Sequence, residues 1–194
     1  MKMTKYKTIL ADPPWSFGNK NTGGSMKSGS ANKYQTLCVH DICNIEITIG
    51  DTKSTVKQLA DKNAVLFLWI PTALSTHAEE VINAWGFKFK TKLYWYKPYC
   101  KPKKRGKLGM GFYFRNQIEE CWIATRGKIK PFKSSDQNVI IEYPNKHSQK
   151  PEKFFELVEP VITKHELNPK IELFARNARA GWDGWGFEYP HQKQ

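Results

Sequence analysis

The tetrad Asp12-Pro13-Pro14-Trp15 combines groups that can act together on an amine. Asp12 offers a carboxylate and Pro13 a backbone carbonyl, so two acceptors can hold both hydrogens of an exocyclic amine, such as that of adenine, while its nitrogen attacks a methyl group. The indole of Trp15 can stack on an unstacked base, and the prolines stiffen the turn. A turn that only ends a strand has the same composition, so other residues must decide.

Positive charge is the second signal. The chain carries 31 Lys and Arg against 18 Asp and Glu, a formal net charge of +13. No acid lies between Val81 and Ile118, where aromatic residues alternate with cations. Such a mixture suits nucleic acid, because cations displace counterions from phosphates and rings stack on bases, although a solvated loop is the ordinary alternative. The cations are Lys88, Lys90, Lys92, Lys97, Lys101, Lys103, Lys104, Arg105, Lys107 and Arg115.

Composition limits the class of protein. The 194 residues, 40% of them hydrophobic, predict one domain over residues 1–194 with a real core, and they exclude a disulfide scaffold and a disordered polyelectrolyte. No run approaches the roughly 20 apolar residues of a membrane span, and no secretory signal is evident, so we expect an intracellular, cytoplasmic protein. The four cysteines lack C-x-x-C spacing, which favours free thiols and no metal.

The hydrophobic pattern predicts alternating strands and helices. Residues 64–70 (AVLFLWI) form an apolar run without polar alternation, typical of a buried parallel strand. Polar, acid-free residues 16–35 and basic residues 97–111 predict two mobile loops. We therefore expect an α/β fold with a mainly parallel sheet and helices on both faces. Further strands are expected at residues 6–11, 87–96, 120–125, 138–141 and 170–174, and helices after Asp41, at 51–60, at 72–84 with Thr72 as its cap, and beyond Pro151.

The tetrad and the segments that follow it resemble the MT-A70 family of adenine-N6 methyltransferases. The order of these motifs is specific, and they cover essentially the whole chain. The matching segments after Asp12-Pro13-Pro14-Trp15 are Tyr34-Gln35-Thr36-Leu37, LFLWIP, Leu93-Tyr94-Trp95-Tyr96-Lys97, Arg115-Asn116-Gln117-Ile118-Glu119, His147-Ser148-Gln149-Lys150-Pro151, Ile171-Glu172-Leu173-Phe174-Ala175-Arg176 and Gly181-Trp182.

The resemblance implies a Rossmann-like methyltransferase fold with a permuted motif order and S-adenosyl-L-methionine as cofactor. Catalysis would fall to Asp12, Pro13, Pro14 and Trp15, and cofactor binding to Asp12, Lys150, Phe174, Arg176, Asn177 and Glu188. Lys150 would reach the carboxylate of the cofactor in front of a helix whose amides also attract anions. Phe187 stands where the family commonly has Asn. Lys150 as a solvated side chain and Phe174 as a core residue are the ordinary alternatives.

The same resemblance places a set of residues near the nucleic acid. These are Tyr34, Lys97, Lys101, Lys103, Lys104, Arg105, Arg115, Asn116 and Glu119, with Glu120 as an alternative to Glu119. Tyr34 as a surface residue and the two acids as structural residues are equally compatible with the sequence. The compact chain favours DNA as substrate. RNA, or a catalytically silent nucleic-acid-binding partner subunit, is the alternative, and a homodimer or heterodimer is compatible with either.

Overall fold

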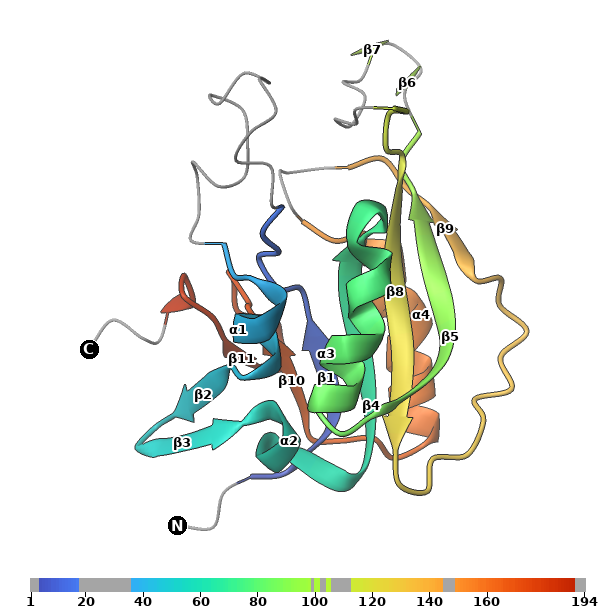
Figure 1. The fold of residues 1–194 in the computed structure, drawn as a ribbon. Coiled ribbons are helices and arrows are strands. Elements are labelled where there is room, and N and C mark those ends of the chain that lie inside the picture. Colours follow the sequence, from blue (N-terminus) through green and yellow to red (C-terminus); the bar gives the residue numbers. More distant parts are fainter. Residues whose placement is uncertain are drawn as a thin grey trace.

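The computed structural model describes residues 4–17, 36–98, 113–144 and 149–190, together with the backbone of 100–101 and 104–105. A seven-stranded sheet in the order β11-β10-β1-β4-β8-β5-β9 forms its centre (Figure 1). Its strands are β1 (Tyr6–Ala11), β4 (Ala60–Pro71), β5 (Lys88–Tyr96), β8 (Ile118–Arg126), β9 (Val139–Ile141), β10 (Lys170–Leu173) and β11 (Asp183–Trp185).

Parallel pairing dominates this sheet. The pairs β1 with β10, β1 with β4, β10 with β11 and β5 with β9 are all parallel, whereas β8 runs antiparallel to both β4 and β5. The expected α/β fold with a mainly parallel sheet is confirmed, and each predicted strand is present, although β4 begins four residues earlier, at Ala60 rather than Ala64. The antiparallel β8 has a functional consequence, because its first residues meet the last residues of β4 and β5 at one edge of the sheet.

Helices cover both faces of the sheet (Figure 1). The helices are α1 (Val39–Cys43), α2 (Val56–Leu59), α3 (Ala78–Ala84) and α4 (Glu152–Lys164), and a 3-10 helix, η2 (Thr72–His77), precedes α3. Strand β4 sends Leu66, Leu68 and Ile70 into the core shared with α3, and it sends Phe67 and Trp69 into the core shared with α4. Both faces of β4 are buried, which explains its unbroken apolar sequence.

Two of the predicted helices differ from the structure. A helix over 51–60 is wrong in its first half, where β2 (Glu46–Ile49) and β3 (Thr52–Thr55) form a hairpin and α2 follows. Gly50 has a φ of 56°, which permits the tight turn, and a capping box between Thr55 and Gln58 starts the helix only afterwards. Thr72 does not cap a helix, since its hydroxyl donates to the carbonyl of Ile118 at 2.9 Å.

The two strands that flank β1 in the sheet are reached through helices on opposite faces. The chain from β1 to β4 contains α1 and α2, which pack in one core. The chain that enters β10 contains α4, which packs in the other core. In open α/β sheets ligands bind outside the carboxyl ends of strands where such connections diverge. This position is occupied by Asp12, the residue that follows β1.

Other expectations concern features around the sheet. Cys38, Cys43 and Cys121 are free thiols, as the sequence predicts. The expected mobile loops lie mostly outside the described residues, apart from residues 16–17 and 97–98 and the backbone of β6 (Cys100–Lys101) and β7 (Lys104–Arg105). Within the described part of the chain, none of the helices has the length and apolar character that a membrane crossing requires.

Candidate active site

Asp12 is held at the end of β1 by an ammonium group from the other end of the chain. The Nζ atom of Lys150 lies 2.8 Å from Asp12 Oδ1, and both side chains are mostly buried. Lys150 precedes α4, whose chain then leads to β10, the direct neighbour of β1. Among the described residues, Asp12 Oδ2 has no hydrogen-bonding partner, so one carboxylate oxygen is left to accept a hydrogen from a ligand.

The same ammonium group also holds Glu119. Lys150 Nζ lies 2.9 Å from Glu119 Oε2, and the other oxygen of Glu119 accepts from Lys97. Lys150 further lies over the ring of Trp69, 5.2 Å from its centroid. Glu119 reaches this place because β8 is antiparallel, with Glu119 opposite Pro71 and Trp95 at the edge of the sheet where β1 ends.

The two carboxylates that share Lys150 have opposite pKa shifts. Burial raises the pKa of Asp12, and Lys150 offsets that effect only in part. Burial acts on Glu119 in the same direction, but Lys150 and Lys97 outweigh it and lower the pKa of Glu119 to about 2. Although burial disfavours a charged Lys150, the two carboxylates raise its pKa. Glu119 is therefore the fixed anion of the cluster, while Asp12 responds to its surroundings.

Glu172 on β10 adds a third carboxyl group to this region. Burial, followed by the charge of Asp12, raises the pKa of Glu172 to about 7, against lowering by Arg179 and Lys150. Glu172 lies opposite Leu10, two residues before Asp12, in the β1 to β10 register. A carboxyl group that titrates near neutral pH beside a second carboxylate is the kind of perturbation that marks functional sites.

The turn after β1 is fixed by its own backbone. The amide of Trp15 donates to the Pro13 carbonyl at 2.8 Å, and the amide of Leu37 donates to the Pro14 carbonyl at 2.8 Å. A carbonyl oxygen has two lone pairs, so Pro13 can still accept a second hydrogen. The indole of Trp15 is 4% exposed and donates from Nε1 to the Trp69 carbonyl at 3.0 Å. Stacking on a base would need ring surface that the structure keeps covered, so Trp15 holds the turn instead.

Most of the expected cofactor residues meet in one cleft beside Asp12. The cleft is lined by Asp12, Pro14, Phe174, Ala175, Arg176, Phe187 and Glu188. Phe174 follows β10 with a φ of 62°, a left-handed conformation that is rare for a bulky residue and is typical of functional turns. Arg176 lies 3.8 Å from Glu188, whereas Asn177 is exposed and is not among the lining residues.

Aromatic rings form the wall of this cleft. Phe174, Trp185 and Phe187 contact one another with centroids 5.6 to 6.4 Å apart, and Phe187 remains 51% exposed. Gly186 allows the close approach of this segment, since a Cβ there would lie 2.3 Å from the Ala175 carbonyl oxygen. Rings, an arginine and an acid suit the adenosine half of S-adenosylmethionine, whose ribose hydroxyls need an acceptor. The residues present therefore fit the expected cofactor.

The start of α4 differs from the expectation. Its amides were expected to attract an anion beside Lys150, but the Glu142 carboxylate already accepts from the amides of Glu152 and Lys153, each at 3.0 Å. The prediction that this helix end binds a ligand is therefore wrong. Lys150 itself is directed to Asp12 and Glu119, so its expected contact with the cofactor carboxylate remains a prediction.

Few of the expected nucleic-acid contacts reach the site in the described part of the chain. Lys97 pairs with Glu119 and lies over Trp95, 4.3 Å from the ring centroid, so it is not a free phosphate contact. Arg115 and Asn116 are exposed and close to β8 in the chain. Tyr34 and Lys103, like His147, lie outside the described residues, and only the backbone is described for Lys101, Lys104 and Arg105.

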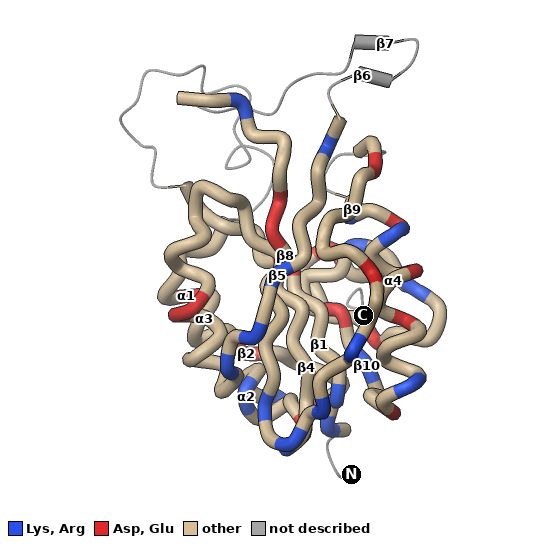
Figure 2. The backbone as a smooth tube through the Cα atoms, turned by 90° about the vertical axis from the view of Figure 1, so that its right-hand side faces the viewer, with Lys and Arg blue, Asp and Glu red and all other residues tan. Residues whose placement is uncertain are grey.

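The described cations do not all flank Asp12. Lys88 lies opposite Thr125 at the end of the sheet away from Asp12, and Lys90 follows it. Figure 2 shows Lys and Arg gathered along that end. Lys92 binds Glu120 at 2.9 Å, and Glu120 also accepts from Trp122 at 2.8 Å, which gives this acid a structural role. Lys88 and Lys90 therefore lie away from the Asp12 turn, at the opposite end of the strands.

The sequence analysis did not identify several residues that form or support the candidate site. Glu172 was visible as an acid inside a buried strand, a pattern that signals a perturbed carboxyl group. Trp69 was visible only as part of an apolar run, and nothing in that run separates a ring beneath Lys150 from any other core residue. Glu142 gave no signal, because its contact with α4 depends on the loop that precedes the helix.

Comparison with known proteins gives a consistent result. The MT-A70 family model matches residues 6–188. The Type II methyltransferase M.MunI of Mycoplasma sp. is 28% identical, over 97% of this chain and 80% of its own length. The N6-methyladenosine RNA methyltransferase MTA1 of Pyricularia oryzae is 25% identical, over 96% of this chain and 47% of its own. The human N(6)-adenine-specific methyltransferase METTL4 is 27% identical, over 94% of this chain and 37% of its own length. The chain thus spans less than half of these two eukaryotic relatives.

Proposed function

The chain belongs to the MT-A70 family of S-adenosylmethionine-dependent adenine-N6 methyltransferases, and on that premise we propose that it methylates the N6 amine of adenine in DNA. The observation that carries the proposal is the cluster of Asp12, Lys150 and Glu119 at the carboxyl end of β1. The choice of DNA is supported by the relative that this chain covers to 80%, which is named a Type II methyltransferase.

The chemistry assigns a task to each group in the cluster. When bound, S-adenosylmethionine supplies the methyl group, which leaves a sulfonium sulfur for the adenine nitrogen. Asp12 Oδ2 and the Pro13 carbonyl accept the two amine hydrogens and orient the nitrogen lone pair. Lys150 opposes the rise that burial causes in the pKa of Asp12, and Glu119 fixes Lys150 in turn. After transfer the extra proton on the nitrogen leaves to water, so no strong base is needed.

The cofactor cleft supplies binding rather than chemistry. Phe174 and Phe187 offer ring surface to the adenine of S-adenosylmethionine, and the Glu188 carboxylate is placed to accept from ribose hydroxyls. Arg176 pairs with Glu188 and orients that carboxylate. This assignment explains how a chain with Phe187 in place of the common Asn retains a cofactor site, because aromatic contact replaces a hydrogen bond.

RNA is the second candidate substrate, because the Pyricularia relative is named an RNA methyltransferase. An unstacked adenine presents the same amine on either sugar. A silent partner subunit is disfavoured by the complete Asp12, Pro13 and Lys150 set. These readings predict different outcomes in one assay.

The test is transfer of a labelled methyl group from S-adenosylmethionine to matched DNA and RNA oligonucleotides. We expect labelling of DNA, with N6-methyladenine as the product in nucleoside mass spectrometry. Asp12→Ala should abolish labelling, and Asp12→Asn, which keeps one acceptor oxygen but loses the charge, should reduce it strongly. Labelling that is unchanged in Asp12→Ala would overturn the mechanism, and labelling of RNA alone would overturn the choice of DNA.

A further inference from the structure

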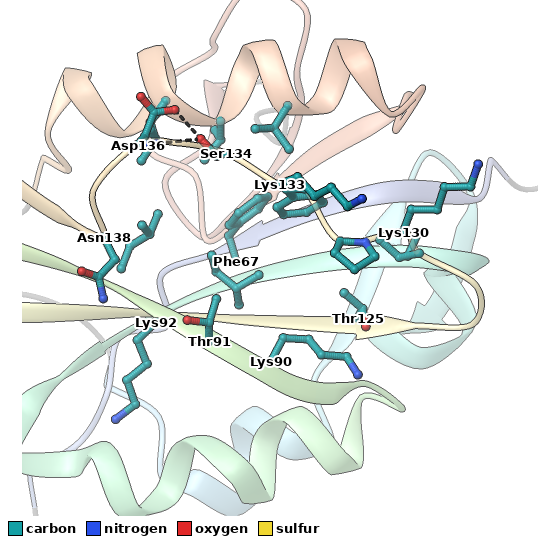
Figure 3. Close-up of a pocket in the computed structure, with 18 of the residues that line it drawn as sticks. Phe67, Lys90, Thr91, Lys92, Thr125, Lys130, Lys133, Ser134, Asp136 and Asn138 are labelled. Carbon is teal, nitrogen blue, oxygen red and sulfur yellow. Dashed lines mark hydrogen bonds between the residues drawn. The ribbon is translucent and has the colours of Figure 1, made fainter.

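A cavity of about 510 Å³ lies well away from Asp12, between the sheet and α4. It is covered by residues 127–138, which connect β8 to β9 without helix or strand (Figure 3). Thr125, in its wall, is six residues beyond Glu119 on β8, or roughly 20 Å along the strand. Pockets of this volume hold organic molecules of drug size. The methyl-transfer site accounts for none of the residues that line it.

The middle of the cavity is apolar and partly aromatic. Leu93 of β5, Phe67 of β4 and Val158 of α4 line its floor, and Phe132 of the covering segment packs against the same core. Most of the covering segment is exposed, and its side chains that pack against this core are Ile129 and Phe132. An apolar cavity that a chain leaves unfilled forfeits packing contacts, which a flat apolar ligand would restore.

The two ends of the cavity differ in charge. Figure 3 shows Lys90, Lys130 and Lys133 around one end, with Asp136 and Asn138 toward the other. Lys92 lies on the side of Asn138, but its ammonium group is paired with Glu120. Within the described part of the chain, none of Lys90, Lys130 and Lys133 forms an ion pair or hydrogen bond. Asp136 is the single acid in the lining, and it is engaged by Ser134. Three unpaired cations at one end favour an anionic group there.

A bulge in β5 gives the cavity its cationic end. The register to β8 shifts between Phe89 and Thr91, with Lys90 as the extra residue. Phe89 contacts Trp122, on the face toward α3, whereas Lys90 and Thr91 both line the cavity on the face toward α4. In a regular strand, the side chains of Lys90 and Thr91 would point to opposite faces of the sheet. Bulges commonly re-aim a side chain beside a binding site.

We propose that this cavity is a second, non-catalytic binding site for a nucleotide. The phosphate lies at Lys90, Lys130 and Lys133, the base lies against the half-buried ring of Phe132, and its polar edge meets the opposite, polar end of the cavity. An aliphatic acid would match the cations but would bring an apolar tail to that polar end. The choice of a nucleotide rests on the proposed nucleic-acid substrate, and the nucleotide is either free or part of a strand.

The experiment measures binding of AMP, GMP, CMP and UMP to the full chain by calorimetry, with S-adenosylhomocysteine present at saturation to fill the cofactor cleft. Lys130→Gln combined with Lys133→Gln removes two cations, and Val161→Phe fills the cavity without changing charge. We expect each variant to weaken binding at least tenfold. Lys128→Gln and Lys164→Gln, which remove exposed cations outside this lining, are the matched controls and should leave binding unchanged.

Three further measurements in the same experiment identify the source of the nucleotide and test the proposal against other ligands. A twelve-nucleotide single strand that displaces the mononucleotide identifies a strand as the source, and one that does not displace it identifies the free nucleotide. Inorganic phosphate that binds as tightly as any nucleotide, or decanoate that binds where no nucleotide does, overturns the proposal, as does full binding to Val161→Phe. Asp12→Ala should retain this binding while losing methyl transfer, which separates failure of this site from failure of the proposed function.

Discussion

Asp12 and Glu119 are held by the same ammonium group, at 2.8 Å and 2.9 Å from Lys150 Nζ. These residues come from the end of β1 and the start of β8, and the lysine comes from the residues before α4. Lys150 is thus shared by two mostly buried carboxylates, of which Glu119 also pairs with Lys97. Removing Lys150 leaves uncompensated negative charge in a site of low dielectric, which is costly.

Replacement of Lys150 by Gln should move the pH dependence of methyl transfer. Lys150 lowers the pKa of Asp12, so its loss raises that pKa further, and the acidic limb of the kcat profile should shift to higher pH. At pH 7 we expect a loss of at least tenfold, together with lower thermal stability. Lys164→Gln, at the end of α4, is the control. An acidic limb at the same pH in Lys150→Gln contradicts the role given to Lys150.

Glu172 should make the protein less stable as the pH rises from 4.5 to 7. Its pKa is about 7 in the folded chain against 4.5 ordinarily, so in this interval the folded state binds the proton and the unfolded state does not. Folding stability therefore decreases with pH, by on the order of 3 kcal/mol in total. Glu172→Gln should flatten this decrease in thermal melts, and exposed Glu156→Gln should not. Parallel curves of melting temperature against pH for the wild type and Glu172→Gln would contradict this role of Glu172.

Gly186→Ala should damage the cofactor cleft selectively. The added Cβ would lie 2.3 Å from the Ala175 carbonyl oxygen, so the segment that carries Phe187 and Glu188 must move. Overpacking of this kind costs roughly 1–3 kcal/mol. We expect at least tenfold weaker binding of S-adenosylhomocysteine by calorimetry. Gly50→Ala, where a Cβ meets nothing but φ is 56°, should reduce stability and leave that affinity intact.

Trp15→Phe tests whether the indole acts by holding the turn. The substitution keeps an aromatic ring but loses the Nε1 donor to the Trp69 carbonyl, leaving a buried carbonyl without this partner. We expect a loss of about 1–3 kcal/mol in the free energy of unfolding, measured by urea denaturation. The KM for DNA should change little. A large increase in KM at unchanged stability would instead assign the ring to the base.

Most of the strands were predictable because they are apolar runs bounded by turn residues, such as Gly86, which has a φ of 81° and lies between α3 and β5. The hairpin formed by β2 and β3 was not predicted, because β2 alternates polar and apolar residues over only four positions and β3 is polar throughout. Propensity alone could not show that the 3-10 helix η2 precedes α3, since the Thr72 hydroxyl is taken by a carbonyl from β8.

The sequence predicted which residues form the candidate site better than it predicted the contacts between them. Asp12, Lys150, Phe174, Arg176 and Glu188 follow strands or precede a helix, and the topology brings such ends together. The sharing of Lys150 by two carboxylates depends on the direction of β8, which is a property of pairing between distant segments. The cavity below α4 also escaped prediction, because it results from a bulge and a roof that packing leaves unfilled.

The pairing of β1 with β10 also governs when the site can form. Thr8 lies opposite Lys170, so β1 cannot complete its pairing in the sheet until β10 has been synthesised. During translation the Asp12 turn emerges early, but Lys150 and Glu172 leave the ribosome only when most of the chain has been made. Contacts of such long sequence separation fold slowly. A nascent chain thus carries the methyl-transfer tetrad for most of its synthesis without an assembled site around it.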